Sequence, residues 1–288
     1  MSQTSTFQTE QPPGGVGVID ALGMGWRLLM GDFWRLWLVA LVPMAIQMGA
    51  SLIGQCFGAI PFVGPVFSCG IGLLMGLFVQ PALAVGLFYA IRRKIDGAEA
   101  EVGNVFEGFR QRYWQSVVAS LPPFGVGLVI GVAVVAIVAV VVLVGFGLEP
   151  NPQDEEVAIA TLVGLGLSLP VIIIGILVSI LFTFSLLAVW DHPESGWEAV
   201  KDSVRLVKSH YLSTLGFAIL AVLIMLAAAV AGTIALCVGT LITMPAAAAL
   251  LHAAVIYLYR SWTGQPLVQP ISPVSDGPAG WSPAAPLP

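Results

Sequence analysis

Residues 66–94, VFSCGIGLLMGLFVQPALAVGLFYAIRRK, decide the fold of this chain. The first 26 of them hold no charged side chain, and three basic residues occupy the last three positions. An uncharged apolar run of about 20 residues is long enough to cross the hydrocarbon core of a bilayer as a helix. The run therefore predicts a membrane span that ends in a basic loop.

Five further stretches share this character, so the sequence predicts an all-α fold, a polytopic bundle of six transmembrane helices. No Asp, Glu, Lys or Arg lies inside any of these stretches. The six predicted spans are Leu36–Phe57, Val66–Ala90, a stretch within Val117–Leu148, a stretch within Val157–Trp190, Leu215–Val238 and Leu241–Tyr259.

The composition of the 288 residues agrees with this architecture and excludes several others. Hydrophobic residues make up 58% of the chain and charged residues 9%, whereas a soluble domain usually has about 25% charged residues. The same hydrophobicity excludes a disordered chain. Eleven Lys and Arg against sixteen Asp and Glu give a net charge of −5, so the chain has no basic field that would bind nucleic acid.

The basic residues predict the orientation of the spans. All eleven lie before span one, between spans two and three, between spans four and five, or after span six, and the other three loops hold none. Short loops rich in Lys and Arg stay on the cytoplasmic side. We therefore expect a multi-pass membrane protein with both termini in the cytoplasm.

The third and fourth apolar runs are longer than a single crossing requires. Each exceeds 30 residues, which is about 45–50 Å as one helix, whereas the hydrocarbon core is about 30 Å thick. We expect Pro122-Pro123 to break the start of the third run and Pro170 to kink the fourth. The alternative is that both spans tilt strongly or project past the outer surface.

The segments that precede spans one, three and five share apolar residues at i, i+4, i+7 and i+11, which places each set on one face of a helix. We interpret them as three units, each an interfacial amphipathic helix followed by a transmembrane hairpin. The alternative is that the segments are connectors packed against each other. The residues expected at the membrane interface are Leu22, Trp26, Leu29, Phe33, Val102, Phe106, Phe109, Tyr113, Val200, Val204, Val207 and Tyr211.

The predicted spans offer little chemistry. Without carboxylates at depth, neither an intramembrane protease nor carboxylate-coupled ion transport is expected, and we predict no enzymatic activity, no metal and no cofactor. Cys56 and Cys69 flank the first outer turn. The sequence allows two alternatives, a disulfide across the turn or two free thiols. His252 in span six is most simply interpreted as bonded to a helix carbonyl. The residues that could line a cavity are Gln80, Ser179, Thr183 and His252.

The two ends of the chain differ from the spans. Residues 1–13 hold no Lys or Arg, and no apolar run follows them directly, so a cleaved signal peptide is not expected. We expect three regions: a disordered N-terminus at 1–15, a six-span membrane domain at 16–264 and a flexible Pro-rich tail at 265–288.

Several motifs resemble recurring features of bacterial six-span membrane proteins. They are DHPESGWEAVKDSVRLVKSHY (191–211), PALAVGL (81–87) followed by IDG (95–97) and VFEGF (105–109), and ITMP (242–245) with YLYRSWTG (257–264). Together they resemble uncharacterised membrane families related to the membrane domain of some glycerophosphodiester phosphodiesterases. The likeness covers roughly residues 18–264. It implies an integral, multi-pass protein of the bacterial inner (plasma) membrane with an accessory role, and it transfers no catalytic residues.

Two functions fit these observations. The first is a non-enzymatic membrane protein whose cytoplasmic interfacial helices organise lipid or partner membrane proteins. The alternative is a transporter or permease for a small neutral or lipidic molecule, which would need a mid-membrane cavity lined by the four polar residues named above. The expected partners are membrane lipid and another membrane protein, with no nucleic acid.

Overall fold

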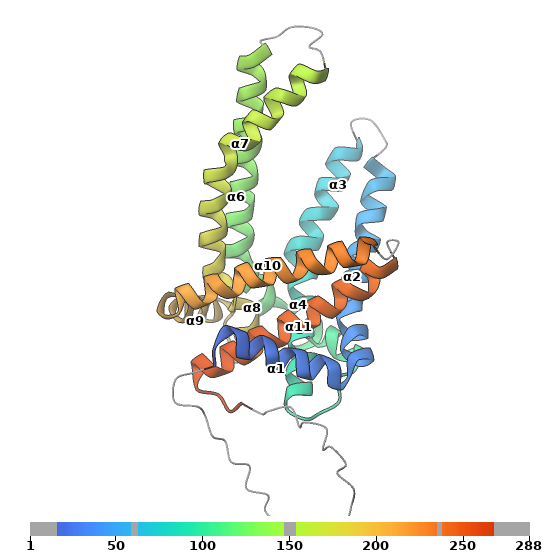
Figure 1. Cartoon of the computed structure of the whole chain (residues 1–288), viewed down its shortest axis with the longest axis vertical. Helices are drawn as coiled ribbons and strands as arrows, with labels where there is room; N and C mark the ends of the chain where they lie inside the picture. Colours follow the sequence, from blue (N-terminus) through green and yellow to red (C-terminus); the bar gives the residue numbers. More distant parts are fainter. Residues whose placement is uncertain (1–15, 59–62, 147–153, 235–237, 268–288) are drawn as a thin grey trace, which may run out of the picture.

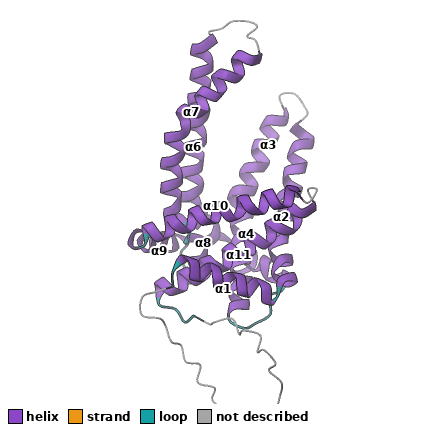
Figure 2. Ribbon diagram, viewed as in Figure 1, coloured by secondary structure: helices purple, strands orange, loops and turns teal. Residues whose placement is uncertain are grey.

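The computed structural model describes residues 16–58, 63–146, 154–234 and 238–267. Helices account for most of these residues, and no strand occurs among them (Figure 2). Six segments within the described ranges are long and apolar enough to cross a membrane, which confirms the predicted all-α, six-helix architecture. They are Phe33–Phe57, Phe67–Ile95, Tyr113–Val144, Ile159–Ala188, Tyr211–Ile234 and Gly239–Thr263.

The helices fall into three successive units. The first contains α1 (Val18–Gly31), α2 (Phe33–Gly58), α3 (Val63–Leu74), the π-helical η1 (Met75–Val79) and α4 (Gln80–Ile95). The second contains the 3₁₀ turn η2 (Val102–Phe106), α5 (Glu107–Gln111), α6 (Tyr113–Phe146), α7 (Asp154–Ser179), the 3₁₀ turn η3 (Ile180–Phe182) and α8 (Ser185–Ala188). The third contains α9 (Gly196–Ser209), α10 (Tyr211–Ile234) and α11 (Val238–Thr263).

A single non-helical residue joins the short helix of each unit to the span that follows. These residues are Asp32, Arg112 and His210, whose φ angles of −151°, −134° and −127° leave the helical range. In each unit the amide four residues later donates to the carbonyl of the junction residue, at 3.2, 2.9 and 2.9 Å. The residue directly after each junction is aromatic. The three units therefore share a backbone conformation as well as a sequence spacing.

Each short helix packs on the second span of a hairpin. α1 lies along α11, η2 and α5 lie against α4, and α9 lies against α8 and η3. Glycines permit the closest approaches. A Cβ on Gly25 of α1 would lie 3.0 Å from the carbonyl oxygen of Leu250, and a Cβ on Gly108 of α5 would overlap the carbonyl of Ala82. Because α1 packs on the final span, the first unit is in direct contact with the last.

The three hairpins do not run parallel. Figure 1 shows α6 and α7 as one long arm and α2 and α3 as another, with α10 and α11 running across the base of both. α11 is the most buried of the six spans, because α1, α2, α4 and α10 all pack on it. The indole N–H of Trp37 on α2 donates to the carbonyl of Leu241 on α11 at 3.2 Å. The start of α11 therefore lies near the first turns of α2, an oblique placement that the sequence does not predict.

The third span is one unbroken helix. α6 runs through Pro122 and Pro123 for 34 residues, about 51 Å at 1.5 Å per residue, so the prediction of a break at this pair is wrong. A membrane helix keeps its hydrogen-bonded form around proline, because the hydrocarbon core offers a broken backbone no water. The length of α6 matches the alternative in which these spans tilt or project.

The fourth span is interrupted well after Pro170. α7 continues through this residue and bends along its length in Figure 1, and the α-helical pattern gives way at Ile180–Phe182. The fully buried hydroxyl of Ser203 on α9 accepts from the amide of Phe184 at 3.2 Å and donates to the carbonyl of Leu181 at 2.9 Å. This hydroxyl supplies partners that an interrupted, buried helix would otherwise lack.

Replacing Ser203 by Ala should destabilise the fold, because the buried amide of Phe184 and the partly buried carbonyl of Leu181 each lose a partner. We expect a loss of about 2–3 kcal/mol in the free energy of unfolding, which is the lower part of the ~1–3 kcal/mol for each unsatisfied group because Leu181 is only partly buried. Thermal melting of the purified protein in detergent measures the effect. Ser209→Ala is the matched control, because Ser209 lies on the same helix and is exposed. Equal melting temperatures for the two variants would contradict the role given to Ser203.

The crossing between α4 and the η2–α5 segment should tolerate no side chain at its glycines. A Cβ on Gly86 would overlap the carbonyl of Val105, and one on Gly108 the carbonyl of Ala82. We expect Gly86→Ala and Gly108→Ala each to cost about 2–3 kcal/mol of stability, because backbone must move to relieve the overlap. Gly103→Ala, whose Cβ meets no atom within 4 Å, should melt like the wild type. A wild-type melting curve for Gly86→Ala would refute the close crossing.

Candidate functional site at the charged end

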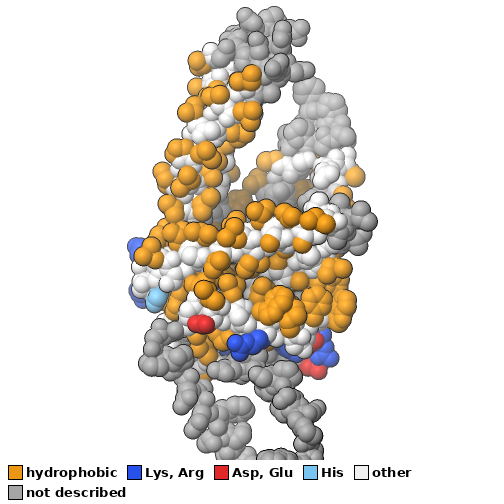
Figure 3. All heavy atoms as spheres, in the orientation of Figure 1, with side chains coloured by type: hydrophobic (Ala, Val, Ile, Leu, Met, Phe, Trp, Pro, Cys, Tyr) orange, Lys and Arg blue, Asp and Glu red, His pale blue; other side chains and the backbone are white. Residues whose placement is uncertain are grey.

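Charged side chains gather at one end of the molecule, around α1, α9 and the last turns of α4 and α11 (Figure 3). We name this part the charged end and define it as residues 18–35, 89–115, 190–211 and 257–265. It holds all eleven Lys and Arg residues of the chain. Ion pairs join its elements, among them Lys94–Asp32 at 2.6 Å and Arg35–Glu99 at 2.9 Å. The arms beyond it present mainly apolar side chains.

The ends of spans two, four and six meet at one carboxylate. Asp191 accepts from Arg92 at 3.0 Å, from the hydroxyl of Tyr259 at 2.7 Å and from the side-chain amide of Gln265 at 3.1 Å. We name these four residues the Asp191 cluster. The side chains of Asp191 and Arg92 are 22% and 27% exposed, so this charge-assisted pair is better shielded from water than an ordinary surface pair. A single acid thus connects the three even-numbered spans.

Aromatic rings and a guanidinium flank the cluster. The indole N–H of Trp190 donates to the carbonyl of Val85 at 2.9 Å, and its ring stacks on Tyr89 at 4.6 Å between centroids. Arg112 lies over the same indole at 5.8 Å and donates to the carbonyl of Pro193 at 3.1 Å. These contacts tie the start of α6 to the ends of spans two and four.

A second ion pair joins the ends of spans two and six. Arg260 is only 4% exposed and donates to Asp96 at 2.7 Å, and the Asp96 side chain is 47% exposed. Within the described ranges no acceptor contacts the Nε of Arg260. Sequence reasoning did not select Asp191 or Arg260 as site residues. The signal available in the sequence was their position, because Asp191 directly follows the fourth predicted span and Arg260 directly follows the sixth.

Four tryptophans project from the charged end. Trp26, Trp34, Trp114 and Trp197 are 53%, 67%, 68% and 51% exposed. We name them the tryptophan rim. They belong to all three units, since they lie on α1, at the starts of α2 and α6, and on α9. Exposed indoles are typical of the zone where lipid headgroups meet the hydrocarbon core.

The twelve residues predicted at the membrane interface differ widely in exposure. Leu29, Val200 and Val207 are at most 4% exposed, whereas Trp26, Val102 and Phe106 are 40% exposed or more. The apolar face of α9 therefore packs on the bundle, because neighbouring helices offer it an apolar and closely packed surface. The other six are partly buried: Leu22, Phe33, Phe109, Tyr113, Val204 and Tyr211.

Two of the three predicted amphipathic segments are single helices. α1 and α9 have 14 residues each, whereas the second segment consists of η2 and the short α5. The outward face of α9 presents Trp197, Lys201 and Lys208. Lys201 donates to the exposed carboxylate of Glu198 at 2.8 Å, and this hydrogen bond lowers the pKa of Glu198. The exposed face of α9 thus combines an indole with basic side chains.

The four residues predicted to line a cavity are divided between different places. Ser179 and Thr183 line a cavity of about 340 Å³ between α6 and the fourth span, and neither Gln80 nor His252 is among its lining residues. Gln80 is exposed at the start of α4. The Nδ1 atom of His252 lies 2.7 Å from the carbonyl oxygen of Ala248, which is the helix contact that the sequence favours.

Cys56 and Cys69 are free, exposed thiols, so the possible disulfide is not formed. Among the residues that the structure describes, no group of three or more His, Cys, Asp or Glu side chains could hold a metal ion. The expected N-terminal region at 1–15 and most of the expected tail, from residue 268 onward, lie outside the described residues.

These features define the chain as a multi-pass α-helical membrane protein, whose apolar outer surfaces contact lipid. The chain belongs to the family of the domain of unknown function DUF7847, which matches residues 51–261. The prediction of an uncharacterised family is thereby confirmed. No curated protein and no solved structure matches. The matched region includes Arg92, Asp191 and Tyr259 and begins within α2.

Replacing Asp191 by Ala should loosen the charged end, because Arg92 loses its carboxylate and the hydroxyl of Tyr259 loses its acceptor. We expect a loss of about 2–3 kcal/mol in stability, below the ~3–5 kcal/mol of a fully buried pair because water reaches part of the cluster. Thermal melting in detergent measures the loss. Glu194→Ala removes an exposed acid from the same loop and is the control. If both variants melt like the wild type, Asp191 does not hold the spans together.

Proposed function

We propose that this chain is a non-enzymatic integral membrane protein whose charged end lies at the membrane surface and organises lipid or a partner membrane protein there. The observation that carries the proposal is the tryptophan rim, to which all three units contribute. An exposed indole has an apolar body that suits the acyl-chain boundary and an N–H that suits the headgroups. Packed helices hold the four rings, so they offer lipid a fixed surface.

We further propose that the charged end faces the cytoplasm of a bacterium, in the inner (plasma) membrane. The support is the segregation of every Lys and Arg to this end, since basic loops are retained on the cytoplasmic side. Both termini would then be cytoplasmic, because α1 begins and α11 ends in this part of the fold. The motif likeness to the membrane domain of some glycerophosphodiester phosphodiesterases supports an accessory role.

Part of the basic charge at this end points away from the protein. The side chains of Arg110 and Arg205 are 77% and 84% exposed, although each has an acidic neighbour three residues earlier. Positive side chains beside exposed indoles suit a leaflet with anionic headgroups. Membrane lipid is therefore the first partner that we propose, and a second membrane protein is the other.

The transporter alternative has weaker support. Its four candidate residues do not lie around one cavity, since Ser179 and Thr183 line the cavity beside α6 and His252 bonds to its own helix. No observation at the charged end favours transport over lipid contact.

The triple variant Trp26→Glu, Trp114→Glu and Trp197→Glu tests the proposal. Each change should remove about 2.5 kcal/mol of apolar contact with lipid, at ~25 cal/mol per Å² over roughly 100 Å² of ring. The measurement is the number of lipids, or the amount of partner membrane protein, that co-purifies from gentle detergent, determined by mass spectrometry. We expect retention to fall by at least half.

The matched control is the triple variant with Phe at the same three positions, which keeps an aromatic ring at each. It should retain lipid and partner protein as the wild type does. Unchanged retention by the Glu variant, with both proteins folded, would contradict the proposed role of the rim.

A further inference from the structure

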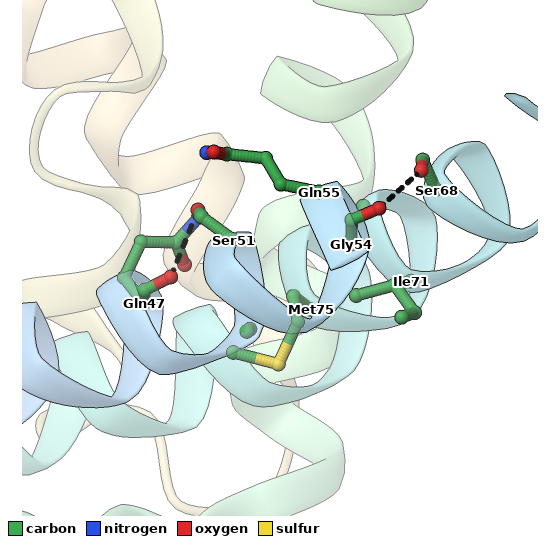
Figure 4. Close-up of a pocket in the computed structure, with 9 residues that line it drawn as sticks. Gln47, Ser51, Gly54, Gln55, Ser68, Ile71 and Met75 are labelled. Atoms are coloured by element: carbon green, nitrogen blue, oxygen red, sulfur yellow. Dashed lines mark hydrogen bonds between the residues drawn. The ribbon is translucent and has the colours of Figure 1, made fainter. Parts of the chain in front are cut away.

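A groove of about 530 Å³ lies between α2 and α3, away from the charged end. Figure 4 shows its residues, with Gln47, Ser51 and Gln55 along α2 and Ser68 and Met75 on the facing segments. The volume is within the range of about 300–1,000 Å³ that small-molecule sites occupy. The remaining lining residues are Ala50, Gly54, Ile71 and Gly72.

Small side chains and a change of helix type create this groove. Gly54 on α2 and Gly72 on α3 leave open the space that larger residues would fill, and a Cβ on Gly72 would meet no atom within 4 Å. The hydroxyl of Ser68 donates to the carbonyl of Gly54 at 2.8 Å and bridges the two helices. Met75 begins the π-helical turn. There the backbone N–H of Gln80 donates to the carbonyl of Met75, five residues earlier instead of the four of an α-helix.

The groove contains polar groups without protein partners. The hydroxyls of Ser51 and Ser68 bond to backbone carbonyls on α2. The side-chain amides of Gln47 and Gln55 have no hydrogen-bond partner among the residues described. Each amide offers two N–H donors and one acceptor. Both side chains are exposed, and at the depth of the hydrocarbon core such a group is costly unless a ligand or water bonds to it.

The charge and depth of the groove limit what it can hold. No residue that lines it is ionisable, so nothing there offsets a phosphate or an ammonium group. Gln47 and Gln55 lie twelve and twenty residues beyond Arg35 on one helix, about 18 and 30 Å along its axis. The groove therefore extends from the middle of the bilayer toward the surface opposite the charged end. Its occupant would be uncharged and would come from the bilayer.

We propose that this groove binds an uncharged lipid with hydroxyl and ester groups, such as a diacylglycerol. The glutamine amides can donate to its ester carbonyls and accept from its hydroxyl, and Ile71 and Met75 contact its acyl chains. Hydroxyl and ester oxygens match amides that both donate and accept. The site is separate from the tryptophan rim and does not depend on the proposed function of the charged end.

A photoreactive diacylglycerol tests this site. The full chain is reconstituted in phosphatidylcholine nanodiscs that contain the diazirine-bearing probe, and the labelled peptides are identified by mass spectrometry. We expect labels on α2 and α3. Gly72→Leu fills the groove and should lower labelling of these helices about tenfold, which corresponds to ~1.4 kcal/mol. Gly70→Leu is the matched control, because its Cβ also meets no atom within 4 Å and it does not line the groove.

Gln47→Leu provides a second variant that keeps the groove's volume and removes one amide. It should also lower labelling while the melting temperature stays close to that of the wild type. Equal labelling of wild type, Gly72→Leu and Gln47→Leu would overturn the proposal. Equal competition by unlabelled phosphatidylglycerol would overturn the selectivity for an uncharged lipid. Competition by free glycerol at the same concentration as unlabelled diacylglycerol would overturn the lipid source and indicate a soluble polyol.

Discussion

The absence of water from the hydrocarbon core is the constraint on which the rest of this structure depends. Backbone groups must find partners within the protein, so the long apolar stretches that the structure describes are helical. Charged side chains collect at one end, and Asp191 joins the ends of three spans there through Arg92, Tyr259 and Gln265. Ser203 shows the same constraint on a smaller scale, because it satisfies the backbone where the fourth span is interrupted.

A repeated unit explains how six apolar helices form one fold. In every unit a short helix ends at a single non-helical residue and an aromatic residue starts the next span. Each short helix then packs on the second span of a hairpin, with α1 on α11 closing the series. Glycines at positions such as Gly86 and Gly108 bring backbones into contact at these crossings. Stability therefore depends on close backbone packing as well as on buried apolar area.

The sequence predicted the architecture because the hydropathy and charge of a segment are local properties. They determine whether that segment lies in the membrane, whatever it packs against. It predicted all six spans and the shared spacing that marks three units. It did not predict the unbroken passage of α6 through Pro122, since proline tolerance depends on the surroundings of the helix. It also could not predict which apolar faces pack on protein: Val200 and Val207 are buried, while Trp114 and Trp197 are exposed. Periodicity identifies a face but not its neighbour.

The candidate site was harder to predict for the same reason. Asp191, Arg92 and Tyr259 are far apart in the sequence and become neighbours only when the even-numbered spans converge. The α2–α3 groove likewise forms only in the folded hairpin, where Gln47 and Gln55 on α2 and Ser68 and Gly72 on α3 line it together.

The central claim is that the three units present their short helices together at the cytoplasmic surface of the membrane. Single cysteines at Arg27, Arg110 and Arg205, one exposed position per unit, test it directly in a chain whose native cysteines are replaced by Ser. Sealed vesicles of known orientation are treated with a membrane-impermeant thiol reagent on either side. The account predicts that all three positions react only from the cytoplasmic side. Reaction of any one of them only from the opposite side would contradict it.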